Sequence, residues 1–116
     1  MSAPPEIQDY HAHVYFDADS RGPARALREE IEAKFDLTMG RWYEKEVGPH
    51  PKWSYQIKFD TLQFAEFVPW LMLNRRDLTI FIHPNTGHDL DDHLDRPLWM
   101  GAILPLKLEI FEANHN

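Results

Sequence analysis

The chain has 116 residues, of which 43% are hydrophobic and 27% are charged. This balance is typical of a folded protein, and the length suits a single compact domain over residues 1–116. With 19 acidic and 12 basic residues the net charge is -7, so the surface repels the phosphates of nucleic acids and of anionic membranes. The composition therefore argues against a nucleic-acid or a membrane partner.

The chain contains no cysteine but has seven histidines, six of which fall between His11 and His93. The absence of cysteine excludes disulfides, thiolate zinc sites and cysteine nucleophiles, so a metal site would use imidazole and carboxylate ligands. The first residues lack the basic and apolar regions of a signal peptide, and the longest apolar run, 67–73, is too short to span a membrane. We expect a soluble, cytoplasmic protein.

The chain opens with a predicted strand and a predicted helix. Residues 10–16 alternate with a period of two, which is typical of a strand. A helix is expected next, with Asp19 or Ser20 as its N-cap and an end near Asp36, because apolar residues recur at helical spacing. The two faces of the strand carry Ala12, Val14 and Phe16 on one side and His11, His13 and Tyr15 on the other.

Two further strands are expected at residues 37–43 and 52–59. Between them lies the sequence Gly-Pro-His-Pro at residues 48–51, which predicts a rigid turn. The two strands therefore form a hairpin whose loop carries His50.

A second helix is expected after this hairpin. Asp60 or Thr61 can cap it, and Gln63 is placed to form a capping box with Asp60. Pro69 is expected to kink the helix or to end its regular part early. The predicted buried stripe consists of Phe64, Phe67, Val68 and Leu71.

The last third of the chain predicts two strands and a loop. Residues 77–82 form a short strand that ends at His83 and Pro84, and residues 104–111 form a last strand. Between them, the polar residues 85–93 are expected to be an ordered loop, whose acidic cluster is solvated.

The order of these elements, β-α-β-β-α-β plus a strand, is that of the ferredoxin-like fold, an α+β fold with two helices on one face of an antiparallel sheet. Its sheet order is 4-1-3-2. We expect the strands 10–16 and 52–59 to run parallel because a helix crosses between them, and the strand 77–82 to lie antiparallel beside 10–16.

This topology brings distant histidines to one edge of the sheet. His83 is expected beside His11 and His13, and the hairpin that carries His50 is expected at the same end. His88 and His93 follow His83 in the loop that leaves this end. Residues two apart on a strand point the same way, so His11 and His13 can reach one metal ion. A His-x-His pair alone is equally compatible with hydrogen-bonded surface histidines, and the convergence strengthens the interpretation as a metal or catalytic site.

The sheet face that carries His11 and His13 is predicted to lack helices of its own. An open sheet face with aromatic side chains must be covered, and a second copy of the chain is the commonest cover. We therefore expect a homodimer, a dimeric α/β barrel-like assembly with a pocket between the sheets.

Four segments, 10–16, 47–51, 81–87 and 88–93, are similar in order and sequence to motifs of one known family. They resemble the DOPA 4,5-dioxygenase family of the small fungal and bacterial type, over nearly the whole chain. The resemblance implies a dimerising ferredoxin-like protein. It also implies extradiol cleavage of a catechol such as L-DOPA by O2, with non-haem Fe(II).

This resemblance leads to a hypothesis for each histidine. His11, His13 and His83 are expected at or next to the metal, since such iron sites leave open coordination positions on one face. His50, on its rigid loop, would be the catalytic acid/base or a further ligand. His88 ranks lower because its loop is expected to be more mobile.

The carboxylate of a two-histidine, one-carboxylate site is not selected by the sequence. Asp89 and Glu109 are both candidates, and a three-histidine site is the alternative. Arg41 and Tyr43 share a predicted strand face and could bind a substrate carboxylate or hydroxyl.

Two other classes of function remain open. The first is a metal-free dimeric protein that binds a small aromatic ligand, because fold alone does not assign an activity. The second is an isomerase or hydrolase that uses another divalent metal, such as zinc.

Overall fold

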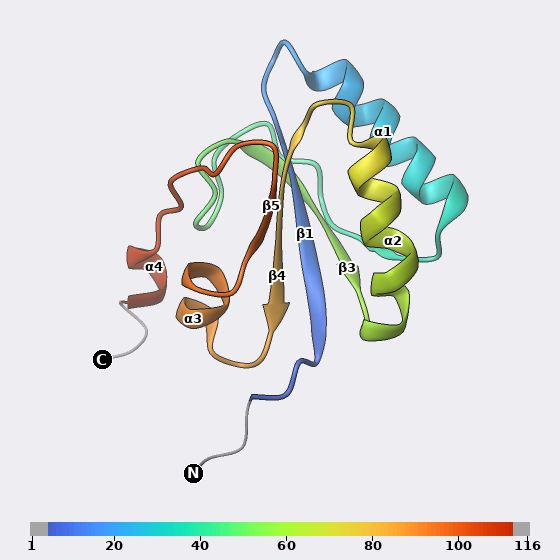
Figure 1. Ribbon diagram of the computed structural model, residues 1–116. Coiled ribbons are helices and arrows are strands. Elements are labelled where there is room, and N and C mark those ends of the chain that lie inside the picture. Colours follow the sequence, from blue (N-terminus) through green and yellow to red (C-terminus); the bar gives the residue numbers. More distant parts are fainter. Residues whose placement is uncertain (1–4, 113–116) are drawn as a thin grey trace.

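The computed structural model describes residues 5–112 and forms one open sheet with helices around it (Figure 1). The elements are β1 (Asp9–Phe16), α1 (Arg21–Lys34), β2 (Thr38–Met39), β3 (Trp53–Phe59), α2 (Thr61–Asn74), β4 (Thr79–Asn85), α3 (Asp89–Leu94), β5 (Leu98–Met100) and α4 (Glu109–Glu112). The five strands lie in the order β2-β3-β1-β4-β5, and the sheet does not close into a barrel. Over residues 5–112, no helix is long and apolar enough to cross a membrane.

The order of the first four strands is the predicted one, but the predicted direction of β3 is wrong. Tyr10 of β1 lies opposite Phe59 of β3, and Phe16 lies opposite Trp53, so these strands run antiparallel. The physical reason is that helix α1 connects β1 to β2, and β3 lies between these two parallel strands. Every neighbouring pair in the sheet is antiparallel.

The helices α1 and α2 cover one face of the sheet, as predicted (Figure 1). Ala12 and Phe16 of β1 point into this layer and are at most 1% exposed. Leu27 and Ile31 of α1 are fully buried against them. This apolar layer fixes which face of β1 turns away from the helices, because strand side chains alternate between faces.

The second helix begins as predicted and runs further than predicted. The Asp60 carboxylate accepts a hydrogen bond from the Gln63 backbone, and the Gln63 side chain accepts one from the Asp60 backbone, so the capping box is present. The prediction that Pro69 ends the regular helix early is wrong, because α2 continues to Asn74. Pro69 and Ala65 both lie on the exposed side of the helix, where water can satisfy the carbonyl that loses its partner.

The structure places two strand boundaries differently from the sequence prediction. Of the predicted strand 37–43, only β2 is observed, together with one isolated bridge from Tyr43 to Ser54. The strand β4 extends through Pro84 to Asn85, so His83 lies inside the strand. Proline is tolerated there because the pairing of β4 with β5 ends at Ile82, which leaves that side of the strand as an edge.

The C-terminal third differs most from the prediction. The expected loop 85–93 contains the six-residue helix α3, and the last strand is β5 instead of residues 104–111. Gly101 has φ of 86°, a left-handed conformation that turns the chain away after β5. The segment that follows contains Pro105, which cannot donate to a sheet ladder, and it leads into the short helix α4.

The sheet face opposite α1 and α2 is partly covered by the chain itself (Figure 1). The loop between β2 and β3 lies on this face and meets the C-terminal segment, where the Lys107 N–H donates to the Pro49 carbonyl at 2.8 Å. Lys107 also forms an ion pair with Glu46 of this loop. The histidine face of β1 is therefore not as open as the sequence predicts, and the homodimer remains a prediction.

Candidate metal centre

The two central strands bring three histidines together. His11 and His83 are direct register partners across β1 and β4, and His13 follows on the same face of β1. Each of the three offers one ring nitrogen, and these nitrogens all lie within 4.8 Å of one another. The Nε2 atoms of His13 and His83 are 3.1 Å apart. The sheet register alone is therefore enough to assemble the cluster.

The tautomer of His83 is set by its surroundings. Its Nδ1 lies 2.9 Å from the carbonyl oxygen of Pro84, which can only accept, so Nδ1 carries the proton and Nε2 the lone pair. Burial, and then the charge of His93, lowers the pKa of His83 to about 3. Burial also holds the pKa of His13 well below its usual range. Both rings are neutral at pH 7, the form in which imidazole binds metals.

The donor set of this cluster fits a divalent transition metal. Burial lowers the pKa of the half-buried His11 as well, and imidazole ligands suit iron, zinc, copper and nickel. Within the part of the chain that the structure describes, the group able to hold an ion contains no carboxylate. Asp89 and Glu109 are both exposed. The geometry corresponds to the three-histidine alternative.

His50 lies beside the same cluster, but the hairpin that carries it lies at the opposite end of the sheet from the predicted one. Because β1 and β3 are antiparallel, the hairpin lies at the end of the sheet near Phe16, not at the end near His11. The loop nevertheless lies over the sheet face, and the ring centroids of His50 and His13 are 4.2 Å apart. The proximity was predicted, whereas the strand direction used to predict it was wrong.

The phenol of Tyr15 holds His50 in one tautomer. The hydroxyl oxygen of Tyr15 lies 2.6 Å from Nδ1 of His50. Burial raises the pKa of Tyr15, so the hydroxyl keeps its proton at pH 7. Burial, and then the charge of His93, lowers the pKa of His50 to about 4. His50 is therefore a neutral imidazole at pH 7 whose Nδ1 is hydrogen-bonded to Tyr15.

A cavity of about 180 Å³ opens beside His13 and His50. One aromatic ring fits such a volume, since an apolar cavity of about 150 Å³ binds benzene. Tyr43 lines the cavity, whereas Arg41, which was predicted with it, is exposed and lies outside the lining. The remaining lining residues are Val47, Gly48, Pro49, Ser54, Tyr55 and Gln56.

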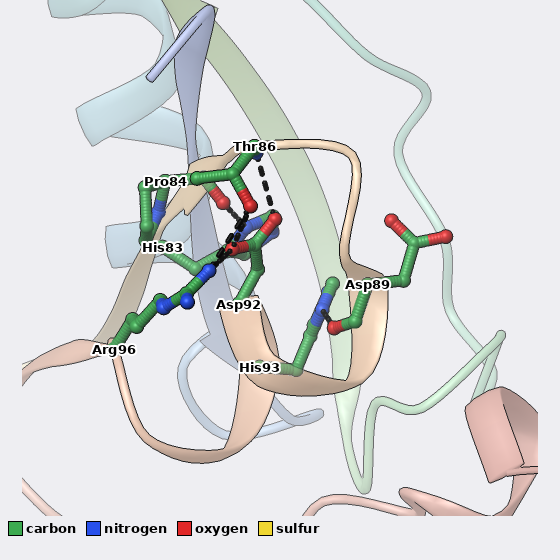
Figure 2. A network of polar contacts seen from close by, with 7 residues as sticks. All are labelled: His83, Pro84, Thr86, Asp89, Asp92, His93 and Arg96. Carbon is green, nitrogen blue, oxygen red and sulfur yellow. Dashed lines mark hydrogen bonds and ion pairs between the residues drawn. The ribbon is translucent and has the colours of Figure 1, made fainter. Parts of the chain in front are cut away.

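Helix α3 brings a fifth histidine to the cluster, His93, which was expected at this edge of the sheet but without a role. The ring centroids of His93 and His83 are 4.0 Å apart, and Nδ1 of His93 donates to the carbonyl of Asp89 at 2.7 Å (Figure 2). His88, the N-cap of α3, is exposed instead. Because His93 bonds the backbone carbonyl of residue 89, the type of residue there gives no signal for this contact.

The fold and the site define a class: an α+β protein whose central strands carry a histidine cluster suited to a metal ion, beside a cavity for one aromatic ring. Residues 10–110 match the model of the Dopa 4,5-dioxygenase family. The chain belongs to this family, which confirms the resemblance seen in its sequence.

Three relatives illustrate this similarity. The chain is 49% identical to a "putative dioxygenase" of Nostoc punctiforme in a crystal structure, with a TM-score of 0.91, and the match covers 93% of this chain and 94% of that one. It is 37% identical to an "Uncharacterized 21.2 kDa protein" of Botryotinia fuckeliana, over 87% of this chain and 62% of that protein. It is 33% identical to the DOPA 4,5-dioxygenase of Amanita muscaria, over 89% of this chain and 49% of that enzyme. The chain thus spans about half to three fifths of the length of these two curated relatives.

Proposed function

We propose that the protein is an extradiol ring-cleaving dioxygenase that acts on a catechol such as L-DOPA with O2 and non-haem Fe(II). The observation that carries the proposal is the cluster of neutral imidazoles beside a cavity for one ring, in a member of the Dopa 4,5-dioxygenase family. The reaction breaks one ring carbon–carbon bond next to a hydroxyl-bearing carbon and places both atoms of O2 in the product. The catechol supplies the electrons, so no other reductant is required.

In this proposal His11, His13 and His83 hold the iron through ring nitrogens. A bound ferrous ion supplies electron transfer between O2 and the catechol and makes the catechol hydroxyls more acidic. Its place between β1 and β4 is supported by the convergence of the three nitrogens. In the metal-free protein, His13 donates from Nε2 to the lone pair on Nε2 of His83. A metal ion on Nε2 of both rings would require His13 to carry its proton on Nδ1 instead.

We assign the proton transfer to His50. Its ring lies beside His13 and lines the cavity, and its Nδ1 is hydrogen-bonded to Tyr15. A neutral imidazole can take a proton from a catechol hydroxyl and later return it to the opening ring. Tyr43 lines the same cavity and is assigned to the substrate. Arg41 lies outside that lining and receives no assignment.

The change Tyr15→Phe tests this assignment. It removes the hydrogen bond that fixes the His50 tautomer but leaves the ring packing in place, so kcat/KM is expected to fall by about 10- to 100-fold. The iron content is expected to stay at the wild-type value. Steady-state oxygen uptake and metal analysis measure the two quantities. A Tyr15→Phe protein with unchanged kcat/KM would exclude a contribution of the phenol to the proton transfer.

We further propose that the fold is ferredoxin-like, that residues 1–116 form one domain and that the protein is a cytoplasmic homodimer. The fold proposal is supported by the sheet order β2-β3-β1-β4 with α1 and α2 on one face. The dimer is supported by exposed apolar side chains on the segment that covers the other face, such as Ile103, which is 79% exposed. A clean monomer in sedimentation at micromolar concentration would contradict the dimer.

Oxygen uptake after anaerobic reconstitution with Fe(II) tests the proposed function. We expect oxygen consumption and a new yellow product with L-DOPA or caffeate. Iron binding without oxygen uptake on any catechol would exclude the dioxygenase and favour a metal enzyme of another kind. The absence of iron binding would favour the metal-free ligand-binding protein.

A further inference from the structure

Asp92 is a buried carboxylate in an otherwise exposed acidic segment. It is 1% exposed, whereas Asp89 and Asp91 of the same helix are exposed. The prediction that this acidic cluster is solvated is therefore wrong for Asp92. A buried carboxylate is costly unless charged or polar partners satisfy it, so its surroundings must supply such partners.

Three hydrogen bonds satisfy this carboxylate (Figure 2). The backbone N–H of Thr86 donates to Oδ2 at 2.8 Å, and the hydroxyl of Thr86 donates to Oδ1 at 2.8 Å. Nη1 of Arg96 donates to Oδ1 at 2.9 Å. Burial alone would raise the pKa of Asp92, but these bonds and the Arg96 charge together lower it. The carboxylate is therefore ionised and paired.

These hydrogen bonds hold α3 at the end of β4. Thr86 directly follows β4, and Arg96 follows α3, so the Asp92 carboxylate joins the entry and the exit of the helix. A helix of six residues is not stable by itself in water. Contacts of this kind are what hold α3 in its place.

Helix α3 in turn places His93 between two rings. The centroid of the His93 ring is 4.0 Å from that of His83 and 4.3 Å from that of Phe111. The ring of His83 is thus restrained twice, by the Pro84 carbonyl at Nδ1 and by His93 against its ring. The contact with His93 therefore restricts the rotation of the His83 ring.

We propose that Asp92 is a positioning residue of the histidine cluster, which holds His93 against His83 and thereby fixes the direction of the His83 Nε2 lone pair. The expected effect of Asp92 on metal binding rests on the proposed function. The expected effect of Asp92 on the His83 and His93 rings does not. Outer-shell groups that orient imidazole ligands typically change metal affinity by about 10- to 100-fold when they are removed.

The change Asp92→Ala tests the proposal with two readouts. In the metal-free protein, long-range ¹H–¹⁵N spectra report which nitrogen of each imidazole carries the proton. We expect His93 and His83 to be protonated at Nδ1 in the wild type, and His93 to become a mixture of tautomers in the variant. Titration with Co(II), followed by its d–d absorption, is expected to show about 10- to 100-fold weaker binding and a changed spectrum.

Two other variants complete the experiment. Asp91→Ala removes an exposed carboxylate from the same helix and is expected to keep the wild-type tautomers and a Co(II) affinity within twofold. Asp92→Asn has nearly the size of the native side chain but one acceptor oxygen fewer, so we expect an intermediate loss. If Asp92→Ala does not fold, Asp92→Asn is used for both measurements instead.

Wild-type tautomers and Co(II) affinity in a folded Asp92→Asn or Asp92→Ala protein would overturn the proposal, even if the variant were less stable, because Asp92 would then support only the fold. If the wild type binds no Co(II), the proposed metal function fails, and the tautomers of the metal-free proteins still decide whether Asp92 positions the rings.

Discussion

The change His83→Ala is expected to abolish stoichiometric Fe(II) binding and to lower ring-cleaving turnover by more than about 100-fold, beyond what the loss of an outer-shell group costs. It removes one of the three nitrogens that lie within 4.8 Å of one another. The fold is expected to remain because β4 still pairs with β1 and β5 on its two sides. Metal analysis, oxygen uptake and far-UV circular dichroism measure the three quantities.

His88→Ala is the matched control for this experiment. His88 lies five residues further along the chain, is exposed and caps α3 without a side-chain hydrogen bond. Its removal is expected to leave iron content and turnover within twofold of the wild type. Unchanged iron and activity in His83→Ala would remove His83 from the site. A large loss in His88→Ala would mean that the wrong histidine had been assigned.

The second large effect is expected for Leu71→Ala in the core. Leu71 is fully buried where α2 packs on the sheet. Truncation of a buried leucine removes apolar contacts and leaves a cavity, so the free energy of unfolding is expected to fall by about 3 to 4 kcal/mol. Urea denaturation of the metal-free protein measures this change.

Leu73→Ala provides the same chemical change on the same helix in a different environment. Leu73 is 86% exposed, so its truncation is expected to change the free energy of unfolding by less than about 0.5 kcal/mol. Similar losses in the two variants would contradict the packing of α2 described above. Similar losses would also be the sign of a partner that covers Leu73 in solution.

The elements with strong periodicity could be predicted from the sequence. The alternation in β1 and the apolar spacing in α1 follow from burial against one layer, and the pair of Asp60 and Gln63 marks the start of α2. These signals are local, because each depends on residues a few positions apart. The stripe of α2 was predicted with one difference, since Phe64 is only half-buried.

Short elements could not be predicted in the same way. Helix α3 is too short to show a helical period, and it depends on the tertiary bonds of Asp92. The segment 104–111 is rich in leucine. Its apolar residues pack against the rest of the protein, but the segment does not form a strand of the sheet. The direction of β3 was predictable, because the predicted strand order places β3 between β1 and β2, and the crossover through α1 makes those two strands parallel.

The part of the candidate site that depends on the pairing of β1 with β4 was predicted from the sequence. His11 and His83 were expected to be neighbours, and the register pairs them directly. Tyr15 was seen only as a strand residue, because its bond to His50 links residues 35 positions apart. His93 was expected at the same edge as His83, but its contact with the His83 ring depends on α3.

The most direct test of the account uses isotopically labelled oxygen. The protein is reconstituted with Fe(II) and supplied with L-DOPA under ¹⁸O2, and the ring-cleaved product is analysed at once by mass spectrometry, before its new carbonyl oxygens exchange with water. The account predicts a product that carries two ¹⁸O atoms, together with one O2 consumed for each catechol. Ring cleavage with no ¹⁸O in the product, or O2 consumption that yields hydrogen peroxide and an intact ring, would contradict it.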